Sequence, residues 1–183
     1  MEQKKNKLLS DMIQNDTDKK MVQLVEAATD LSCGDICTLL EVAHSLPFVG
    51  NLEGGDTYIN VLTREKESMV IAQYRHPNYD LYKRSIIGEI ERREDEPAVY
   101  RALEEGISGR GLIGIIDEGR TVVRHTVSPI LNSEKKVIGA LTYEYPNAGA
   151  DTESIRIINN QEGKQDPFNR QLGKASDYLH SSL

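Results

Sequence analysis

The sequence has no broad basic patch, few cysteines and no long apolar segment. Lysine and arginine number 22 against 29 aspartate and glutamate, so the net charge is -7, and basic residues cluster only at Lys4, Lys5 and Lys7. Phosphate backbones are bound by clustered positive charge, so this balance disfavours a nucleic-acid surface. No segment approaches the ~20 apolar residues that span a bilayer, and no apolar region follows the charged start as in a signal peptide. We therefore expect a cytoplasmic protein with no membrane span.

The two cysteines, Cys33 and Cys37, lie four residues apart. On one helix this spacing places both thiols on the same side without the geometry of a disulfide, which suits a reducing compartment. Metal sites usually carry closer pairs than these cysteines and His44 provide, and His76 and His125 lie elsewhere. We expect the cysteines to pack as small apolar residues, with no metal site and no bound cofactor.

The first third of the chain has a helical pattern. Apolar residues from Met21 to Ala28 recur on one face, and we interpret residues 1–30 as an N-terminal helical extension. Ser32 and Asp35 have the spacing of a capping box and predict the start of a second helix. Pro47 is predicted to end this helix, because proline cannot continue its hydrogen-bond ladder.

From residue 56 onward the sequence pattern changes from that of helices to that of strands. Residues 56–63 and 68–75 are rich in β-branched and aromatic residues and predict a hairpin, with a third short strand at 85–90. Two further strands are expected at 121–130 and 137–145. Consecutive strands with tight turns predict an antiparallel sheet, and segregated helices predict an α+β fold.

A further helix is predicted between the two groups of strands. Asp95 is its expected cap, Pro97 lies in its first turn, and Gly106 ends it. The Gly-rich connection 106–119 contains Gly109-Arg-Gly-Leu-Ile-Gly114, which matches the dinucleotide pattern G-x-G-x-x-G. That pattern requires a preceding strand and a following helix, so we expect a flexible loop over the sheet instead.

An acidic run precedes this helix. It consists of Glu89, Glu91, Arg92, Arg93, Glu94, Asp95 and Glu96. Such carboxylates could serve a small hydrolase as acid and base, but charges before a helix more often favour its dipole and meet water. Ser128 and His125 point to opposite faces of one predicted strand, so they form no catalytic pair. We expect no catalytic residue, and a hydrolase remains an alternative.

Polar and aromatic side chains alternate through the strands and the loop after the hairpin. If residues 76–84 cover one sheet face, these side chains line a small ligand cavity of apolar walls with a few polar groups. The alternative is that they form the solvent face of a half-buried sheet. The candidate ligand-binding residues are Tyr58, Asn60, Gln73, Arg75, Tyr79, Tyr82, Thr126 and Ser128.

The last segment, 147–183, is interpreted as a linker and a C-terminal signalling helix. Phe168, Leu172, Ala175 and Leu179 have the spacing of a coiled coil. An amphipathic helix that docks on its own domain fits the same spacing, and the two alternatives stay open.

The segment from Leu31 to Tyr145 resembles the N-terminal GAF-like sensor domain of histidine kinases whose regulators are RNA-binding antiterminators. The matching stretches are Ser45–Pro47, Gly55–Asn60, Val70–Gln73, Leu81–Gly88, Arg93–Val99, Thr126–Ile130 and Val137–Leu141. The sequence contains no phosphoacceptor histidine box and no Asn- and Gly-rich ATP-binding boxes, so the chain itself should phosphorylate nothing. The sensor domain is assigned to residues 31–146.

The resemblance implies a GAF/PAS-like antiparallel sheet flanked by helices. It also implies a small-molecule metabolite as input, a homodimer, and contact with a response regulator through a kinase core further along the chain. We expect a signal-input domain that binds the metabolite and shifts between two conformations. The alternative is a dimerisation module of the kinase without a ligand.

Overall fold

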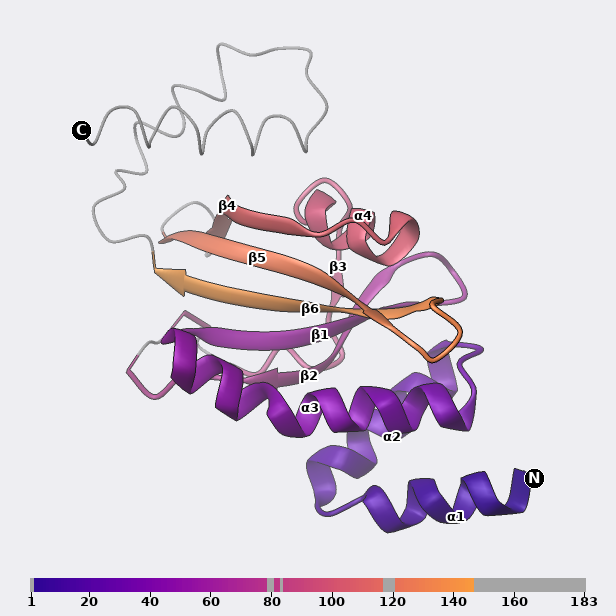
Figure 1. Cartoon of the computed structure of the whole chain (residues 1–183). Coiled ribbons are helices and arrows are strands. Elements are labelled where there is room, and N and C mark those ends of the chain that lie inside the picture. The colour runs from indigo at the N-terminus through magenta and orange to yellow at the C-terminus, as the bar shows by residue number, and fades with distance from the viewer. Residues whose placement is uncertain (1, 79–80, 83, 117–120, 147–183) are drawn as a thin grey trace.

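The computed structural model describes residues 2–78, 81–82, 84–116 and 121–146. The elements are α1 (Glu2–Met12), α2 (Asp16–Ala28), α3 (Cys33–Glu53), β1 (Asp56–Leu62), β2 (Ser68–Tyr74), β3 (Ile90–Glu91), α4 (Pro97–Glu105), β4 (Gly109–Ile116), β5 (Thr121–Leu131) and β6 (Val137–Pro146). The strands form one antiparallel sheet in the order β3-β2-β1-β6-β5-β4 (Figure 1). The predicted α+β class is confirmed.

Side-chain caps start the helices α2 and α3. Asn15 Oδ1 accepts a hydrogen bond from the Asp18 N–H, and Ser32 and Asp35 form the predicted capping box. The predicted end of α3 at Pro47 is wrong, because the helix runs on to Glu53. Proline removes one hydrogen bond there, but the surrounding turns are held by buried residues of α3 such as Leu46.

The hairpin β1–β2 has the predicted position and pairs antiparallel, with a bulge between Ile59 and Asn60. The third strand lies later than predicted, since β3 contains only Ile90 and Glu91. Gly88, whose φ is 94°, interrupts the extended course that the sequence suggested for 85–90. A left-handed residue cannot continue a regular strand.

The N-cap of α4 lies one residue later than predicted. Glu96 rather than Asp95 occupies the N-cap position, without a side-chain cap hydrogen bond, and Pro97 is the first helical residue. Gly106, with φ of 69°, ends the helix as predicted. The fixed φ of proline suits the first turn of a helix. A backbone N–H at this position has no acceptor within the helix, so its absence in proline costs no hydrogen bond.

The segment predicted as a flexible Gly-rich loop is strand β4 in its greater part. It pairs antiparallel with β5, and its register shifts between Gly109 and Leu112. Gly111 has φ of 62° at this irregularity, a value that favours glycine. The G-x-G-x-x-G match therefore lies in an edge strand that follows a helix, which excludes the strand–turn–helix geometry of a dinucleotide site.

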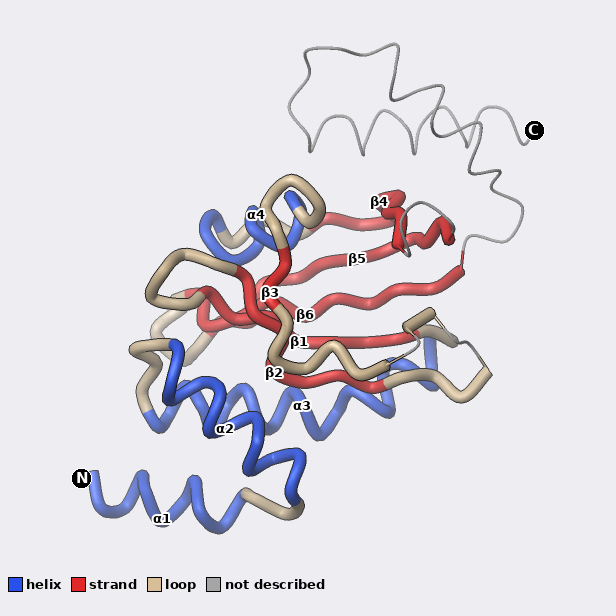
Figure 2. Tube along the Cα trace, turned by 180° about the vertical axis from the view of Figure 1, so that it is seen from behind, coloured by secondary structure: helices blue, strands red, loops and turns tan. Residues whose placement is uncertain are grey.

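The sheet has two differently covered faces. Helices α1, α2 and α3 lie on one side of the sheet and α4 lies on the other (Figures 1 and 2). The larger apolar core joins the first three helices to residues such as Ile59 and Ile71, whereas a smaller one joins α4 to Leu112, Val127 and Ala140. Because side chains alternate along a strand, the residue next to a member of one core points to the sheet face that carries the other core. In the part of the chain that is described, no helix is both long enough and apolar enough to cross a membrane.

Candidate functional site

The face of the sheet on the side of α4 carries a cluster of buried polar side chains. Tyr58 on β1 pairs with Thr142 on β6, and His125 on β5 pairs with Glu144 on β6. All four are at most 1% exposed. Four polar residues at adjacent buried positions are unusual, because polar groups are buried at a cost unless they find partners. We call this group, with the residues added below, the polar cluster.

Glu144 lies at the centre of the polar cluster. The hydroxyl of Tyr58 donates to its Oε1 at 3.0 Å, and that of Tyr82 donates to its Oε2 at 2.6 Å. The two tyrosine rings meet edge to face, with centroids 6.3 Å apart. Burial, followed by the charge of Glu144, raises the pKa of both hydroxyls well above the usual value. Both tyrosines therefore remain protonated donors that fix the carboxyl group in place.

Glu91 of β3 enters the same cluster from the sheet edge. Its Oε2 accepts from Asn60 Nδ2 at 2.7 Å and from Ser68 Oγ at 3.3 Å. Burial and then the charge of Glu144 raise the pKa of Glu91 to about 7, although the hydrogen bonds from Ser68 and Asn60 oppose the shift. A carboxyl group with this pKa titrates near neutral pH.

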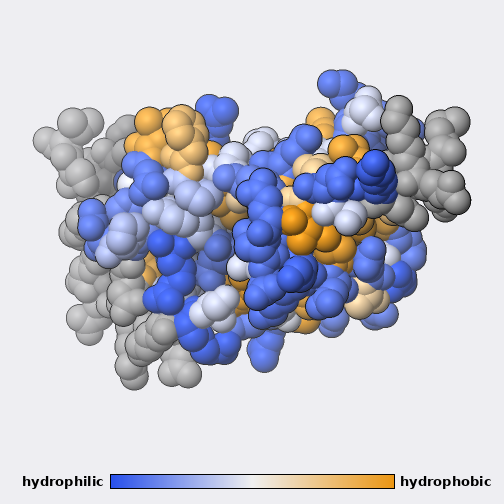
Figure 3. Space-filling model, turned by 90° about the horizontal axis from the view of Figure 1, so that it is seen from below, coloured by the Kyte–Doolittle hydropathy of each residue, from blue (hydrophilic) through white to orange (hydrophobic). Residues whose placement is uncertain are grey.

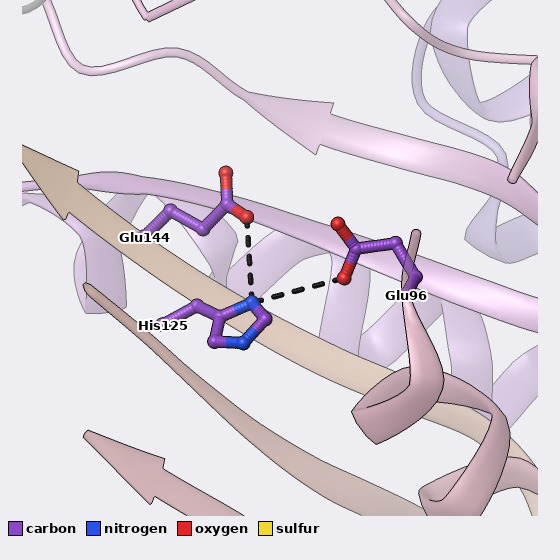
Figure 4. A group of neighbouring side chains, drawn as sticks. All are labelled: Glu96, His125 and Glu144. Carbon is purple, nitrogen blue, oxygen red and sulfur yellow. Dashed lines mark ion pairs between the residues drawn. The ribbon is translucent and has the colours of Figure 1, made fainter. Parts of the chain in front are cut away.

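Glu96 and His125 complete the cluster (Figure 4). The Nδ1 atom of His125 lies 3.7 Å from Glu144 Oε1 and 3.8 Å from Glu96 Oε2. Burial, and then the charges of Glu91 and Glu144, raise the pKa of Glu96 well above its usual range. Two carboxylates and an imidazole at these distances can hold a proton, a metal ion or a cationic group between them.

Several buried polar atoms on this face have no hydrogen-bond partner among the described residues. They are Asp56 Oδ2, Asn60 Oδ1, Gln73 Nε2, Glu96 Oε2, both ring nitrogens of His125 and Thr142 Oγ1. The strand residues in this set share the side of the sheet that carries Tyr58 and Glu144, as the pairing register shows. Buried polar atoms without partners are rare in folded proteins and need a specific explanation, such as a bound ligand.

Two surface grooves lie apart from the polar cluster. One of about 600 Å³ is lined by residues including Ser32, Asp35 and Asn132, and another of about 340 Å³ is lined by residues including Asp18 and His44. The linings of both leave out Glu96, His125 and Glu144, the centre of the cluster.

The structure brings together part of the predicted ligand-binding set. Tyr58, Asn60 and Tyr82 belong to the polar cluster, and Gln73 lies beside Tyr58 with its Oε1 accepting from the Ile86 N–H at 3.1 Å. These four side chains lie on one side of the sheet, and their role in ligand binding stays a prediction.

The other predicted residues lie elsewhere. Thr126 and Ser128 alternate with His125 on β5 and so face the opposite side of the sheet from the polar cluster. Arg75 is exposed just after β2. Tyr79 lies outside the described residues.

Sequence reasoning missed the acidic and histidine members of the cluster. The acidic run was assigned to solvent, and Glu94 and Asp95 are exposed as expected, but Glu91 and Glu96 turn inward. Glu144 belongs to no motif, although it stands in the otherwise apolar and aromatic segment 137–145. A charged residue at a position that alternation predicts to be buried is the signal that could have found it.

The predicted packing of the cysteines holds for Cys37, which is buried in the larger core, while Cys33 is half-buried. Neither of these two cysteines is part of a disulfide. His44 lies on the same helix, but its Nε2 contacts Asp18 Oδ2 at 3.1 Å.

Comparison with known proteins gives one family match and several structural likenesses. A family model described as "Histidine kinase PdtaS, GAF domain" matches residues 21–162. A solved structure described as the sensor region of a sensor histidine kinase is similar with a TM-score of 0.55 and 16% identity, over 87% of this chain and 50% of that chain. A transcriptional regulator from Rhodococcus sp. RHA1 has a TM-score of 0.45 and 14% identity, over 75% of this chain and 65% of that one. No curated protein sequence matches.

These likenesses bear on the fold and on the extent of the chain. At 16% identity the likeness to the sensor region shows the fold alone, and the predicted GAF/PAS-like sheet with flanking helices is confirmed. The chain spans half the length of that sensor region. The division into 1–30, 31–146 and 147–183 stays a prediction.

Proposed function

The chain belongs to the GAF-domain family of the histidine kinase PdtaS, and on this premise we propose that it is a non-catalytic cytoplasmic domain that binds a small metabolite. Binding changes the conformation of the domain, and the change passes to a kinase core further along the protein. A response regulator then receives the signal from that core. The supported part of this proposal is the signal-input role, since the family is one of histidine kinase sensor domains.

The partnerless polar atoms of the polar cluster carry the ligand-binding proposal. An apolar core would serve stability better at these positions, because each buried unpaired group costs about 1–3 kcal/mol. A ligand with donors and acceptors of its own offsets this cost by pairing with Asn60, Thr142 and His125. Selection for binding therefore explains the cluster where selection for stability does not.

The cluster is also placed to transmit a signal. It joins α4 and the segment around Tyr82 to the strands, so a ligand that binds one arrangement of these elements better shifts their populations. Glu144 lies two positions before Pro146, where β6 ends. A change at Glu144 thus reaches the part of the chain that leads toward a kinase core.

An interaction module without a ligand is the second candidate, and a specific observation favours it. Phe48 and Leu52, one turn apart on α3, are 70% and 69% exposed. Figure 3 shows separate apolar patches among hydrophilic residues on this side of the molecule. Large exposed apolar side chains at helical spacing suit a homodimer interface.

Thermal melting of the purified protein against amino acids, amines and nucleotides tests the first proposal, with EDTA present throughout. A ligand at 100 times its dissociation constant adds about 2.7 kcal/mol, which raises the melting temperature by about 5–10 °C. The shift should shrink in Thr142→Val, which removes a partnerless hydroxyl of the cluster without changing its shape. Thr126→Val, on the opposite sheet face, is the matched control and should keep the full shift.

The same measurement separates the two candidates. No shift with any compound, together with a melting temperature that rises with protein concentration, would contradict metabolite binding and favour the dimerisation module. In that case Phe48→Lys should abolish the dependence on concentration.

A further inference from the structure

Glu96, His125 and Glu144 bring one imidazole nitrogen and two carboxylate oxygens within 4.8 Å of one another. We propose that these three side chains bind a divalent transition-metal ion, with Zn²⁺ as the first candidate. The inference rests on the proposed function in taking the polar cluster as the ligand site. It goes further by naming the chemical class of a ligand there and the atoms that hold it.

A buried histidine whose ring nitrogens lack hydrogen-bond partners among the described residues points to the metal. The His125 side chain is 1% exposed, and neither ring nitrogen has a hydrogen-bond partner among the described residues. Its Nδ1 faces Glu144 Oε1 at 3.7 Å and Glu96 Oε2 at 3.8 Å (Figure 4). These separations exceed a hydrogen bond but approach the roughly 3.4 Å between neighbouring ligand atoms around tetrahedral zinc with bonds of about 2.1 Å. The three ligand atoms, which lie within 4.8 Å of one another, would have to move closer together to reach a common ion.

The surroundings of Glu144 match those of a metal-binding carboxylate. Metal ligands are usually oriented by hydrogen bonds from a second layer of residues. Tyr58 and Tyr82 provide two such bonds, one to each carboxylate oxygen. Both tyrosines donate, so they leave the negative charge of the carboxylate available to a cation.

The backbone holds the ligands and leaves space beside the histidine. His125 and Glu144 are directly paired on neighbouring strands, so their side chains share one face in fixed register. Gly114 on β4 adds room, since a Cβ there would lie 3.8 Å from His125 Nδ1 and 3.2 Å from a methyl group of Val123. Glu96 supplies the third ligand from the N-cap of α4.

The ligand types select the metal. Imidazole suits Zn²⁺ and related transition metals, whereas Mg²⁺ and Ca²⁺ prefer oxygen alone. Three protein ligands leave a fourth coordination position open to water or a small molecule, whereas structural zinc sites fill all four positions with protein ligands. A metal at this point would also tie α4 to the sheet, because Glu96 belongs to the helix and the other two ligands to strands.

Isothermal titration calorimetry of the chelator-treated protein with ZnCl₂ tests the inference. We expect one Zn²⁺ per chain, a rise of several degrees in the melting temperature, and no comparable response to MgCl₂. His125→Asn and Glu96→Gln should each lower the affinity at least tenfold. Glu96 makes no side-chain cap hydrogen bond to α4, so its replacement keeps the metal-free fold even if the histidine variant does not fold.

The cysteines require a matched control because thiolates bind zinc strongly. The double variant Cys33→Ser and Cys37→Ser should keep its zinc affinity, and its Co²⁺ complex should show d–d absorption without thiolate charge transfer. Absence of zinc binding, or binding lost in the cysteine variant but kept in His125→Asn and Glu96→Gln, overturns the inference.

The result also separates this inference from the proposed function. If metabolites shift the melting temperature in EDTA and zinc binds nowhere, the metal site is wrong and the input role stands. If zinc binds through these three residues while no metabolite binds and the kinase output of the longer protein ignores zinc, the metal site stands and the input role is wrong.

Discussion

The hydroxyl of Tyr82 donates a hydrogen bond of 2.6 Å to Glu144 Oε2 and thereby joins the segment between β2 and β3 to the last strand of the sheet. Tyr58 donates to the other oxygen of the same carboxyl group. The covering segment is therefore held over the sheet face by a bond to the centre of the polar cluster as well as by apolar contacts of Ile86 and Val70.

Tyr82→Phe removes this hydroxyl and keeps the ring. Hydrogen bonds to charged groups contribute about 1.5–3 kcal/mol, so we expect the free energy of unfolding to fall by roughly that amount. Urea unfolding followed by circular dichroism measures it. Tyr74→Phe is the matched control: its hydroxyl donates to exposed Asn51, so a change below about 1 kcal/mol is expected. Equal losses in both variants would argue against a special role of the Glu144 bond.

The raised pKa of Glu91 makes stability depend on pH. The folded protein holds a proton on Glu91 up to about pH 7, whereas the unfolded chain releases it near the usual value of 4.5. The folded state therefore binds more protons between these values, and the contribution of Glu91 to stability falls as pH rises from about 4.5 to 7.

Glu91→Gln should remove this contribution to the slope. In EDTA at pH 8 we expect the variant to be more stable than the parent by about 1–3 kcal/mol, with little difference at pH 4. Melting curves across this pH range provide the measurement. A parent and variant with parallel pH profiles would show that Glu91 titrates normally.

Gly55 allows the end of α3 to approach β6. A Cβ at Gly55 would lie 2.2 Å from the Glu144 carbonyl oxygen and 2.7 Å from a ring carbon of Tyr143. Gly55→Ala should therefore displace the strand that carries Glu144 and cost about 3 kcal/mol or more. Gly54→Ala meets nothing within 4 Å and carries only the strain of φ at 74°, so we expect about 1–2 kcal/mol. Chemical denaturation of both variants gives their free energies of unfolding and so compares the cost of the steric clash at Gly55 with that of the backbone strain at Gly54.

Arg64 connects the β1–β2 turn to the end of α2. Its guanidinium donates to the carbonyl oxygens of Glu26, Ala27 and Thr29 and to the Asp30 carboxylate. These bonds satisfy carbonyl groups that the helix leaves without partners.

Arg64→Ala should lower the free energy of unfolding by about 1–2 kcal/mol and speed hydrogen exchange in the last turn of α2. Arg64→Lys should recover little, because an ammonium group lacks the planar fork. Lys19→Ala, which breaks an exposed pair with Asp16, should change stability by less than about 0.5 kcal/mol. Full recovery by lysine would show that charge alone matters.

The features predicted well are those that depend on neighbours in sequence. The box of Ser32 and Asp35, the hairpin and the end of α4 at Gly106 all arise within a few residues, so spacing determines them. The error at Pro47 has a different origin: the local cost of proline is outweighed by burial of Leu46 against the sheet, which spacing does not reveal.

The polar cluster depends on strand pairing instead. Alternation correctly separates His125 from Ser128, but it does not say which of them shares a sheet face with Tyr58. That depends on β6 lying between β1 and β5 in the register that opposes His125 to Glu144. Glu96 joins them from the N-cap of α4, a helix that packs on β1, β5 and β6, so no spacing in the sequence links it to Glu144.

The position of β6 has a consequence for folding during synthesis on the ribosome. The hairpin of β1 and β2 and the strands β4 and β5 are synthesised first, yet the strand that joins them in the sheet is the last of the set. A growing chain on the ribosome thus exposes the unpaired edges of two half-sheets until residue 146 has emerged. Long-range pairing of this kind folds slowly and leaves such edges open to aggregation. Folding of this domain therefore depends on β6 leaving the ribosome soon after β5, or on a chaperone that covers the two edges until it does.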